Sequence, residues 1–248
     1  MKSIFLCSSI ILGLVLVLNI QCLAGTWRDD FDDGNYKEEW KIYNLNRAVE
    51  NWRVKDGEAV GEIFQPGFMS LLLTGMDNWT ARTVECRAKF VKEAKDASAE
   101  LGLSLYDGGD DENRYLFVLN LTLGLASISK ESKGQWASAH FRFVSEMNTW
   151  YTLKATVEEQ ELKFEINGET FTGREQDEPL KSGQVGLIVA NARAHFDDVY
   201  ISGPGIPNGG PGKVRAVQPR GKLAARWGQL KTDKYLSEKR QKFSFNPK

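Results

Sequence analysis

The chain has 248 residues and a formal net charge of −1, a length suited to one large β domain or two small ones. This total hides two regions of opposite sign. Residues 25–212 carry 20 Lys+Arg and 31 Asp+Glu, whereas residues 213–248 carry 11 and 2, so the net charges are −11 and +9. One cysteine, Cys86, follows residue 24, and the chain has two histidines, which excludes an intrachain disulfide and a zinc site of the Cys/His type.

The first 24 residues have the pattern of a secretory signal peptide. A positive start, Met1-Lys2-Ser3, precedes an apolar run over residues 4–20 and a small-residue exit at Ala24. We therefore expect cleavage after Ala24, a secreted or cell-surface protein, and no transmembrane segment in the mature chain. A retained membrane anchor is an alternative, because about 17 apolar residues lie at the lower edge of spanning length. A lipid anchor at Cys22 is less favoured, because the residues before it are not small.

Between residues 25 and 202, apolar and polar residues alternate with a period of two, as in strands with one buried face. Asn167-Gly168 and Asp56-Gly57 separate such runs, and Asn-Gly accepts the positive φ angles of a type I′ hairpin. Regularly spaced short strands with such turns predict an all-β sandwich. Cys86 is then a small buried hydrophobic residue rather than a nucleophile. The clearest strand segments are 84–90, 99–106, 115–119, 151–157 and 162–166.

The predicted sandwich ends at Ser202. Residues 203–212 are rich in Gly and Pro, which disfavour helix and sheet ladder alike, so this composition predicts a linker. The basic tail has too few apolar residues for a core of its own and is expected to be mostly irregular. The predicted organisation is a signal peptide (1–24), a β-sandwich (25–202), a linker (203–212) and a basic tail (213–248).

Three parts of the predicted sandwich carry a family resemblance. They are residues 27–34 with Trp40, residues 150–154 with 162–169, and residues 183–187 with 194–199. In this order they resemble the concanavalin A-like lectin/glucanase superfamily, particularly its laminin-G-like and 3-keto-disaccharide hydrolase-type members. The resemblance covers about residues 26–202. It implies a jelly-roll β-sandwich of two curved antiparallel sheets, with a polysaccharide or glycan on the concave sheet or in the loops at its rim.

The resemblance also implies a structural calcium ion. In many glucanase-type relatives the first and last strands meet, and calcium takes an aspartate from the last strand and backbone carbonyls from the first. The matching positions here are Asp30, the turn at Gly57, and Asp197 as the final-strand ligand. Calcium prefers such oxygen ligands. The alternative is that these acidic residues only cap turns and keep the strand ends soluble.

Catalysis is less well supported. Glucanase members of the superfamily use a Glu-x-Asp-x-x-Glu strand motif, which places acids on one strand face, and the sequence lacks it. The acidic run at Glu158–Glu161 is predicted to lie in a turn and has the wrong spacing for a retaining carboxylate pair. Neither a Gly-x-Ser-x-Gly elbow nor a phosphate-binding glycine loop is found. Hydrolysis of the 3-keto-disaccharide type stays open.

A binding face is the remaining candidate. Sugars stack on aromatic side chains while polar groups bond their hydroxyls. Trp40, Trp52 and Trp150 are expected in the core, and His140 has an alternative structural role. The candidate carbohydrate-binding residues are Trp79, Glu85, Arg87, Tyr106, Tyr115, Trp136, His140 and Arg142.

The basic tail, with Trp227 and Tyr235 between its cations, has features of a nucleic-acid-binding segment. An exported protein seldom meets nucleic acid, so an anionic polysaccharide, another cell-surface polymer or the acidic sandwich is the expected partner. The leading hypothesis is an exported carbohydrate-binding or adhesion-like module. The alternatives are an exported glycoside-cleaving enzyme of the 3-keto-disaccharide hydrolase type and a purely structural surface domain.

Overall fold

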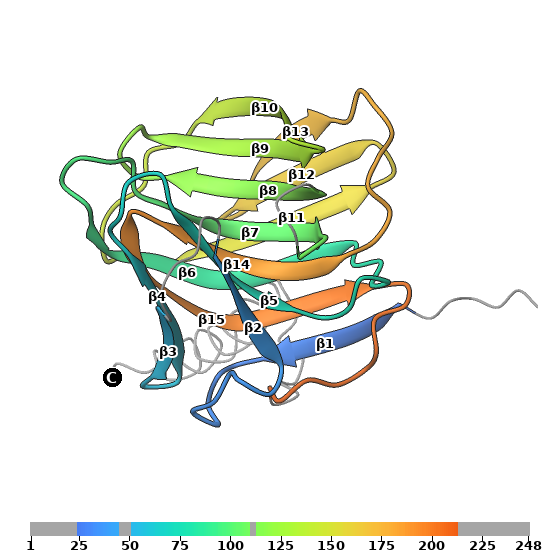
Figure 1. The fold of residues 1–248 in the computed structure, drawn as a ribbon, viewed down its shortest axis with the longest axis horizontal. Coiled ribbons are helices and arrows are strands. Elements are labelled where there is room, and N and C mark those ends of the chain that lie inside the picture. The colour runs from blue at the N-terminus through green and yellow to red at the C-terminus, as the bar shows by residue number, and fades with distance from the viewer. Residues whose placement is uncertain (1–23, 45–50, 110–112, 213–248) are drawn as a thin grey trace, which may run out of the picture. The chain divides into compact units, whose positions relative to one another are not determined.

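The computed structural model describes residues 24–44, 51–109 and 113–212, and every regular element in this part of the chain is a β-strand. The strands form two antiparallel sheets that stack as a sandwich (Figure 1). The all-β prediction is therefore confirmed. The predicted signal peptide and basic tail lie outside the described residues. The described part of the chain contains no helix that is long and apolar enough to cross a membrane.

Sheet A contains eight strands. Seven of them form one path in the order β13 (Glu169–Arg174), β12 (Glu161–Ile166), β11 (Tyr151–Glu158), β6 (Thr83–Glu93), β15 (Ala192–Gly203), β4 (Glu58–Ile63) and β3 (Trp52–Lys55). The eighth, β1 (Gly25–Asp29), pairs with the second half of β15, while β4 pairs with its first half and β6 with both. The first and last strands of the domain thus meet, as the resemblance implied.

Sheet B contains seven strands. Their order is β10 (Gln135–Arg142), β9 (Leu125–Ser132), β8 (Asn113–Asn120), β7 (Glu100–Asp107), β14 (Gln184–Ala190), β5 (Met69–Thr74) and β2 (Trp40–Asn44).

The main core lies between the sheets and follows the alternation of the sequence. On β6, Val84, Cys86, Ala88 and Phe90 are buried, while the residues between them face outward. Burial raises the pKa of the Cys86 thiol, so the side chain is an inert hydrophobic residue, as predicted. Trp40 and Trp52 are in the core as expected. Trp150 is not; it is only half-buried and contacts two cations.

The hairpin turns agree with the turn prediction. Asn167 and Gly168, which connect β12 to β13, both have positive φ, at 52° and 90°. Asp56 and Gly57, between β3 and β4, have φ of 55° and 74°. Residues that tolerate the left-handed region therefore stand where two tight turns need it.

Residues 204–212 differ from the expected linker because they pack on the domain. Arg28 N donates to Gly209 O, Gly209 N donates to Thr26 O, and Gly212 N donates to Arg28 O, each at 3.0 Å. Ile206 is buried in the main core. Gly and Pro give the segment an irregular path, but Ile206 and these backbone hydrogen bonds fix it along β1. The described residues up to Gly212 belong to one compact unit.

Candidate functional site

The eight predicted carbohydrate-binding residues lie in three different places. Trp79, Tyr106 and Tyr115 are buried in the main core. Glu85 and Arg87 lie on the outer face of sheet A. Trp136, His140 and Arg142 lie together on a third surface, which is the outer face of β10 in sheet B.

The three core aromatics have structural partners. Trp79 packs edge-on to Trp27, with ring centroids 6.3 Å apart, and the Tyr106 and Tyr115 rings are 6.0 Å apart. The Tyr115 hydroxyl donates to Glu175 Oε2 at 3.0 Å and accepts from Leu180 N at 2.9 Å. Burial raises the pKa of this hydroxyl. None of the three rings presents a free face to a ligand, because each is at least nine-tenths buried.

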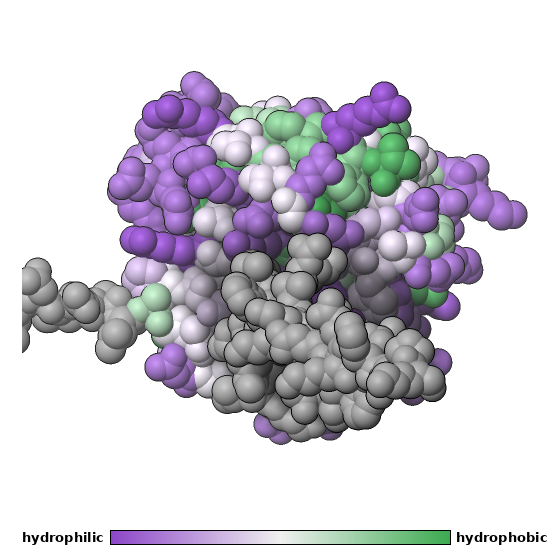
Figure 2. Space-filling model, turned by 180° about the vertical axis from the view of Figure 1, so that it is seen from behind, coloured by the Kyte–Doolittle hydropathy of each residue, from purple (hydrophilic) through white to green (hydrophobic). Residues whose placement is uncertain are grey.

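On the outer face of sheet A, charged side chains pair with one another. Arg87 contacts Asp197 through Nη2 and Asp198 through Nε, the latter at 2.8 Å. The Trp150 ring centroid lies 4.8 Å from the Arg87 guanidinium and 4.1 Å from Lys89 Nζ, both within cation–π range. Figure 2 views the molecule from this side, and hydrophilic residues make up much of the surface outside the grey atoms.

Next to Trp150, Lys89 continues the charged network to Glu58 and His195. Lys89 Nζ lies 3.2 Å from a Glu58 oxygen, and His195 Nδ1 is hydrogen-bonded to the same carboxylate. Burial lowers the pKa of His195, although Glu58 opposes the shift. The charges of this face therefore satisfy each other, which is the usual structural role of such a network.

The three predicted calcium positions lie in different local settings. Asp197 is paired with Arg87, and the Asp30 carboxylate accepts from Asp32 N at 3.4 Å. Gly57 lies beside Asp32, since a Cβ at Gly57 would be 3.0 Å from Asp32 Oδ1. Among the described residues, no group of three or more His, Cys, Asp or Glu side chains is placed to hold a metal ion. Calcium stays a prediction that carbonyl ligands would have to complete.

On the outer face of sheet B, the strand registers define rows of residues. One row joins His140 to Ser127 and Val118, a second joins Ser138 to Ser129 and Leu116, and a third joins Trp136 to Glu131 and Arg114. The first row continues across β7, β14, β5 and β2 as Gly102, Ile188, Leu71 and Tyr43. The second row continues across the same strands as Ser104, Gly186, Leu73 and Lys41.

This face is concave. The Arg114 guanidinium on β8 lies 5.5 Å from the centroid of the Tyr43 ring on β2. Four strand spacings separate β8 from β2, which is about 19 Å across a flat sheet. The two side chains meet because the sheet curls, and in Figure 1 β2 runs across the front of its neighbours.

The concave face has a buried apolar half and an exposed half. The apolar half is a second cluster on β5, β8 and β14, formed by Leu71, Leu73, Leu116, Val118 and Ile188. The exposed half is β10, where Trp136 is 55% exposed and Ser138, His140 and Arg142 are also exposed. Sequence reasoning found only the exposed half, although the segment 115–119 showed the signal, being apolar on both faces.

Between the two halves lies a buried ionic group that sequence reasoning missed. Arg114 Nε lies 3.1 Å from Glu131 Oε2, and Arg114 Nη1 lies 3.5 Å from Asp107 Oδ2. All three residues are at least nine-tenths buried. A lone arginine beside the apolar run 115–119 was the available signal, because buried cations need paired carboxylates.

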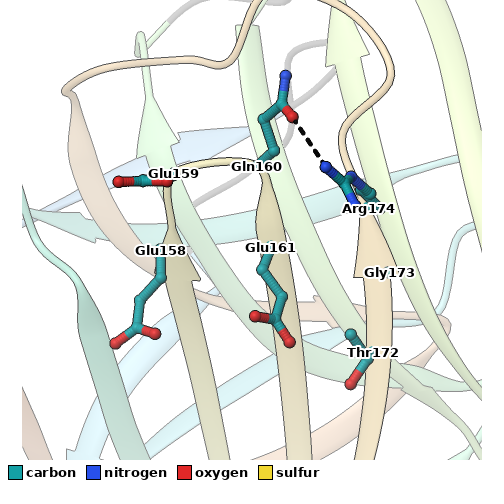
Figure 3. A pocket seen from close by; sticks show the side chains of 7 residues that line it. All are labelled: Glu158, Glu159, Gln160, Glu161, Thr172, Gly173 and Arg174. Carbon is teal, nitrogen blue, oxygen red and sulfur yellow. Dashed lines mark hydrogen bonds between the residues drawn. The ribbon is translucent and has the colours of Figure 1, made fainter.

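The cavity in Figure 3 lies at a different place, at the turn between β11 and β12 and the end of β13. Its volume is about 420 Å³, and Gln160 Oε1 accepts from Arg174 Nη2 at 3.4 Å at its rim. Lys163 Nζ lies 3.3 Å from Glu161 and 3.9 Å from Glu158. The acidic run Glu158–Glu161 spans this turn, as predicted, and a lysine partly neutralises it.

Comparisons with known proteins identify the fold. No family model matches the chain, and no curated protein matches its sequence. The carbohydrate-binding module CBM66 of Bacillus subtilis is 20% identical, with a TM-score of 0.54 over 66% of this chain and 95% of that one. The β-glucanase of Bacillus licheniformis is 12% identical (TM-score 0.56; 71% and 97%), and the laminarinase catalytic domain of Thermotoga petrophila is 14% identical (0.53; 73% and 97%). The chain therefore has the concanavalin A-like lectin/glucanase fold.

Proposed function

We propose that this domain is a carbohydrate-binding module whose site is the exposed half of the concave face of sheet B. The observation that carries the proposal is the common face of Trp136, Ser138, His140 and Arg142 on β10. An exposed indole offers a flat apolar surface for a sugar ring, and the hydroxyl, imidazole and guanidinium groups bond sugar hydroxyls. Similarity to a carbohydrate-binding module and to glucanases of the same fold supports this assignment.

Binding is favoured over hydrolysis by the positions of the acids. Glycosidases need two carboxyl groups about 5–9.5 Å apart at the scissile bond. Glu100 and Glu131 both lie on the concave face, but two rows of paired residues lie between them, and they are about 20 Å apart along the strands. Burial raises the pKa of Glu100, although Asn120 opposes the shift. Asp107 shares Arg114 with Glu131, so both buried carboxylates are paired with this cation.

The test is affinity for glycans on an array of neutral glucans, galactans and acidic polysaccharides, followed by titration calorimetry. For a bound glycan, Trp136→Ala should weaken binding about tenfold or more, because a stacking contact contributes about 1.4 kcal/mol. Trp136→Phe should retain most of the affinity. The matched control is Trp150→Ala on the outer face of sheet A, which should leave affinity unchanged. Equal losses in Trp136→Ala and Trp150→Ala would refute the assignment to this face.

The finer expectations from the sequence remain proposals. Export through residues 1–24 is supported by the signal pattern, and N-terminal sequencing of secreted material should begin at or near Gly25. An anionic polymer is proposed as the partner of the basic tail because of its net charge of +9. A chain ending at Gly212 should then elute from an anionic polysaccharide column at lower salt than the full chain, and equal elution would exclude this role.

A further inference from the structure

Strand β10 differs from the other strands at the ends of the two sheets. Five described strands lie at the ends of the sheets: β10, β13, β3, β2 and β1, with 8, 6, 4, 5 and 5 residues. Three of them carry a charged residue that discourages edge pairing: Glu169 on β13, Lys55 on β3 and Lys41 on β2. The edge of β1 is covered, because residues 209–212 hydrogen-bond along it. The longest, β10, contains no Lys, Asp, Glu or Pro. Its one arginine, Arg142, is its last residue, and its first half is exposed on both faces.

The hydrogen bonds of β10 show which backbone groups face outward. Just after the end of β10, Phe143 N donates to the carbonyl oxygen of Gly124, the residue before β9, at 3.0 Å. Because antiparallel pairs alternate between bonded and non-bonded, the odd-numbered residues of β10 direct their N–H and C=O groups toward β9. The even-numbered residues, from Trp136 to Arg142, direct theirs toward the open edge. This edge is a template for one more strand.

We propose that a second copy of this chain pairs through β10, antiparallel, about a two-fold axis at Ala139. The outward groups belong to even-numbered residues, so only registers that place even opposite even are allowed. A register centred on Ala139 places Trp136 opposite Arg142 of the second copy, and Ser138 opposite His140. Each of these pairs occurs twice, because the contact is two-fold symmetric and self-complementary.

The side chains favour this register over its neighbour. Directly opposed residues have Cβ atoms about 4.5–5.5 Å apart, so the Arg142 guanidinium lies within cation–π reach of the opposing indole. A register centred on Ser138 would place Trp136 opposite His140 and leave Arg142 beyond the paired segment. Ala137 and Ala139 are small and do not obstruct the approach. A contact of seven residues a side is small, so the association should be weak and dependent on concentration.

Pairing through β10 does not require glycan binding, but it would extend the proposed site. Pairing through β10 would join the two concave faces into one continuous sheet of fourteen strands, because each sheet B contributes seven. The two Trp136 side chains would lie on the same side of that sheet. A long polysaccharide could then contact both sites, and its avidity would exceed the affinity of one site.

Site-specific disulfides test the register. In the full chain with Cys7 and Cys22 changed to Ser, Ala139→Cys should form an intermolecular disulfide in mild oxidant. Residues on the two-fold axis at a non-bonded pair have Cα atoms about 4.5 Å apart, within the range that a disulfide spans. The matched control is Ala137→Cys, on the same strand and face, whose symmetry mate would be about 13 Å away. Cys86 is buried and does not compete.

Equilibrium sedimentation of the wild-type chain without glycan gives the independent measurement. The expected result is a mass that rises toward twice the monomer value with concentration, and at least tenfold more cross-linking for Ala139→Cys than for Ala137→Cys. A monomer at every concentration up to about 1 mM would overturn the proposal, and so would equal cross-linking of the two variants. Because sugar is absent, failure here leaves the proposed glycan site unaffected, and failure of the glycan titrations leaves this result unaffected.

Discussion

The outer faces of the two sheets differ in how their charged side chains are paired and buried. Sheet A covers its outer face with charges that pair at the surface, such as Arg87, whose side chain is 42% exposed, with Asp197 and Asp198. Sheet B buries an apolar cluster and the fully buried cation Arg114, and exposes most of β10. An arginine–carboxylate ion pair is therefore expected to affect stability differently on the two faces. Water screens the first network, whereas the second is shielded from water.

The largest expected effect comes from removing the buried cation. Arg114→Ala leaves two carboxylates, Asp107 and Glu131, buried without their guanidinium, and should lower the free energy of unfolding by about 3–5 kcal/mol. Arg87→Ala, the matched change on sheet A, should cost at most about 1 kcal/mol. Urea denaturation of both variants measures the contrast. Similar costs for the two would show that the faces do not differ in this way.

The buried carboxyl group of Asp29 gives the next largest effect. Trp40 Nε1 and Phe31 N donate to the Asp29 carboxylate, and burial raises its pKa from 3.8 to about 6. The folded state then holds this proton more tightly than the unfolded chain does. The contribution of Asp29 to stability is therefore fully present below pH about 4 and is lost as the pH rises to about 6, an effect of about 3 kcal/mol.

Denaturant midpoints across this pH range measure the Asp29 effect. Asp29→Asn cannot ionise and should flatten the decline between pH 4 and 6, whatever its own stability at one pH. Asp56→Asn, at an exposed turn residue, is the control and should leave the decline unchanged. An unaltered slope in Asp29→Asn would assign the pH dependence to other groups.

Calcium binding, if the predicted site forms, has to compete with the sheet A network for Asp197. At about ten times its dissociation constant, calcium should raise the free energy of unfolding by about 1.4 kcal/mol. Arg87→Ala frees the carboxylate and should increase this stabilisation, whereas Asp197→Ala should abolish it. Melting curves with calcium and with chelator provide the measurement. If calcium and chelator give identical melting curves, both for the wild type and for Arg87→Ala, the protein does not bind calcium at this site.

The smallest expected effect concerns Trp150. Trp150→Leu should lower the free energy of unfolding by about 0.5–1 kcal/mol, because the ring contacts two partly exposed cations. A double-mutant cycle with Arg87→Ala isolates the coupling between the two side chains. We expect a smaller loss from Trp150→Leu when Arg87 is already absent. Strict additivity would mean that the ring contributes by packing alone.

The sequence predicted the fold well because its signals are local. Alternation on β6 and the Asn167-Gly168 turn depend on neighbouring residues, and the structure confirms both. The site was less predictable because it depends on strand order. Tyr115 and Trp136 look alike as aromatic residues in alternating strands, yet one lies on the inner face of a central strand and the other on the outer face of an edge strand. Only the register of sheet B connects Trp136 with Glu131 and Arg114.

The central place of β15 in sheet A governs the order in which the domain can assemble. This strand is the last of the described strands to be synthesised, and it joins β6 on one side to β4 and β1 on the other. Strands β1, β3 and β4 therefore have no connection to the rest of their sheet until residues 192–203 have left the ribosome. Contacts of such long sequence separation fold slowly. A nascent chain stalled before Ala192 should expose unpaired edges of β1, β4 and β6, which chaperones would have to shield until β15 is available.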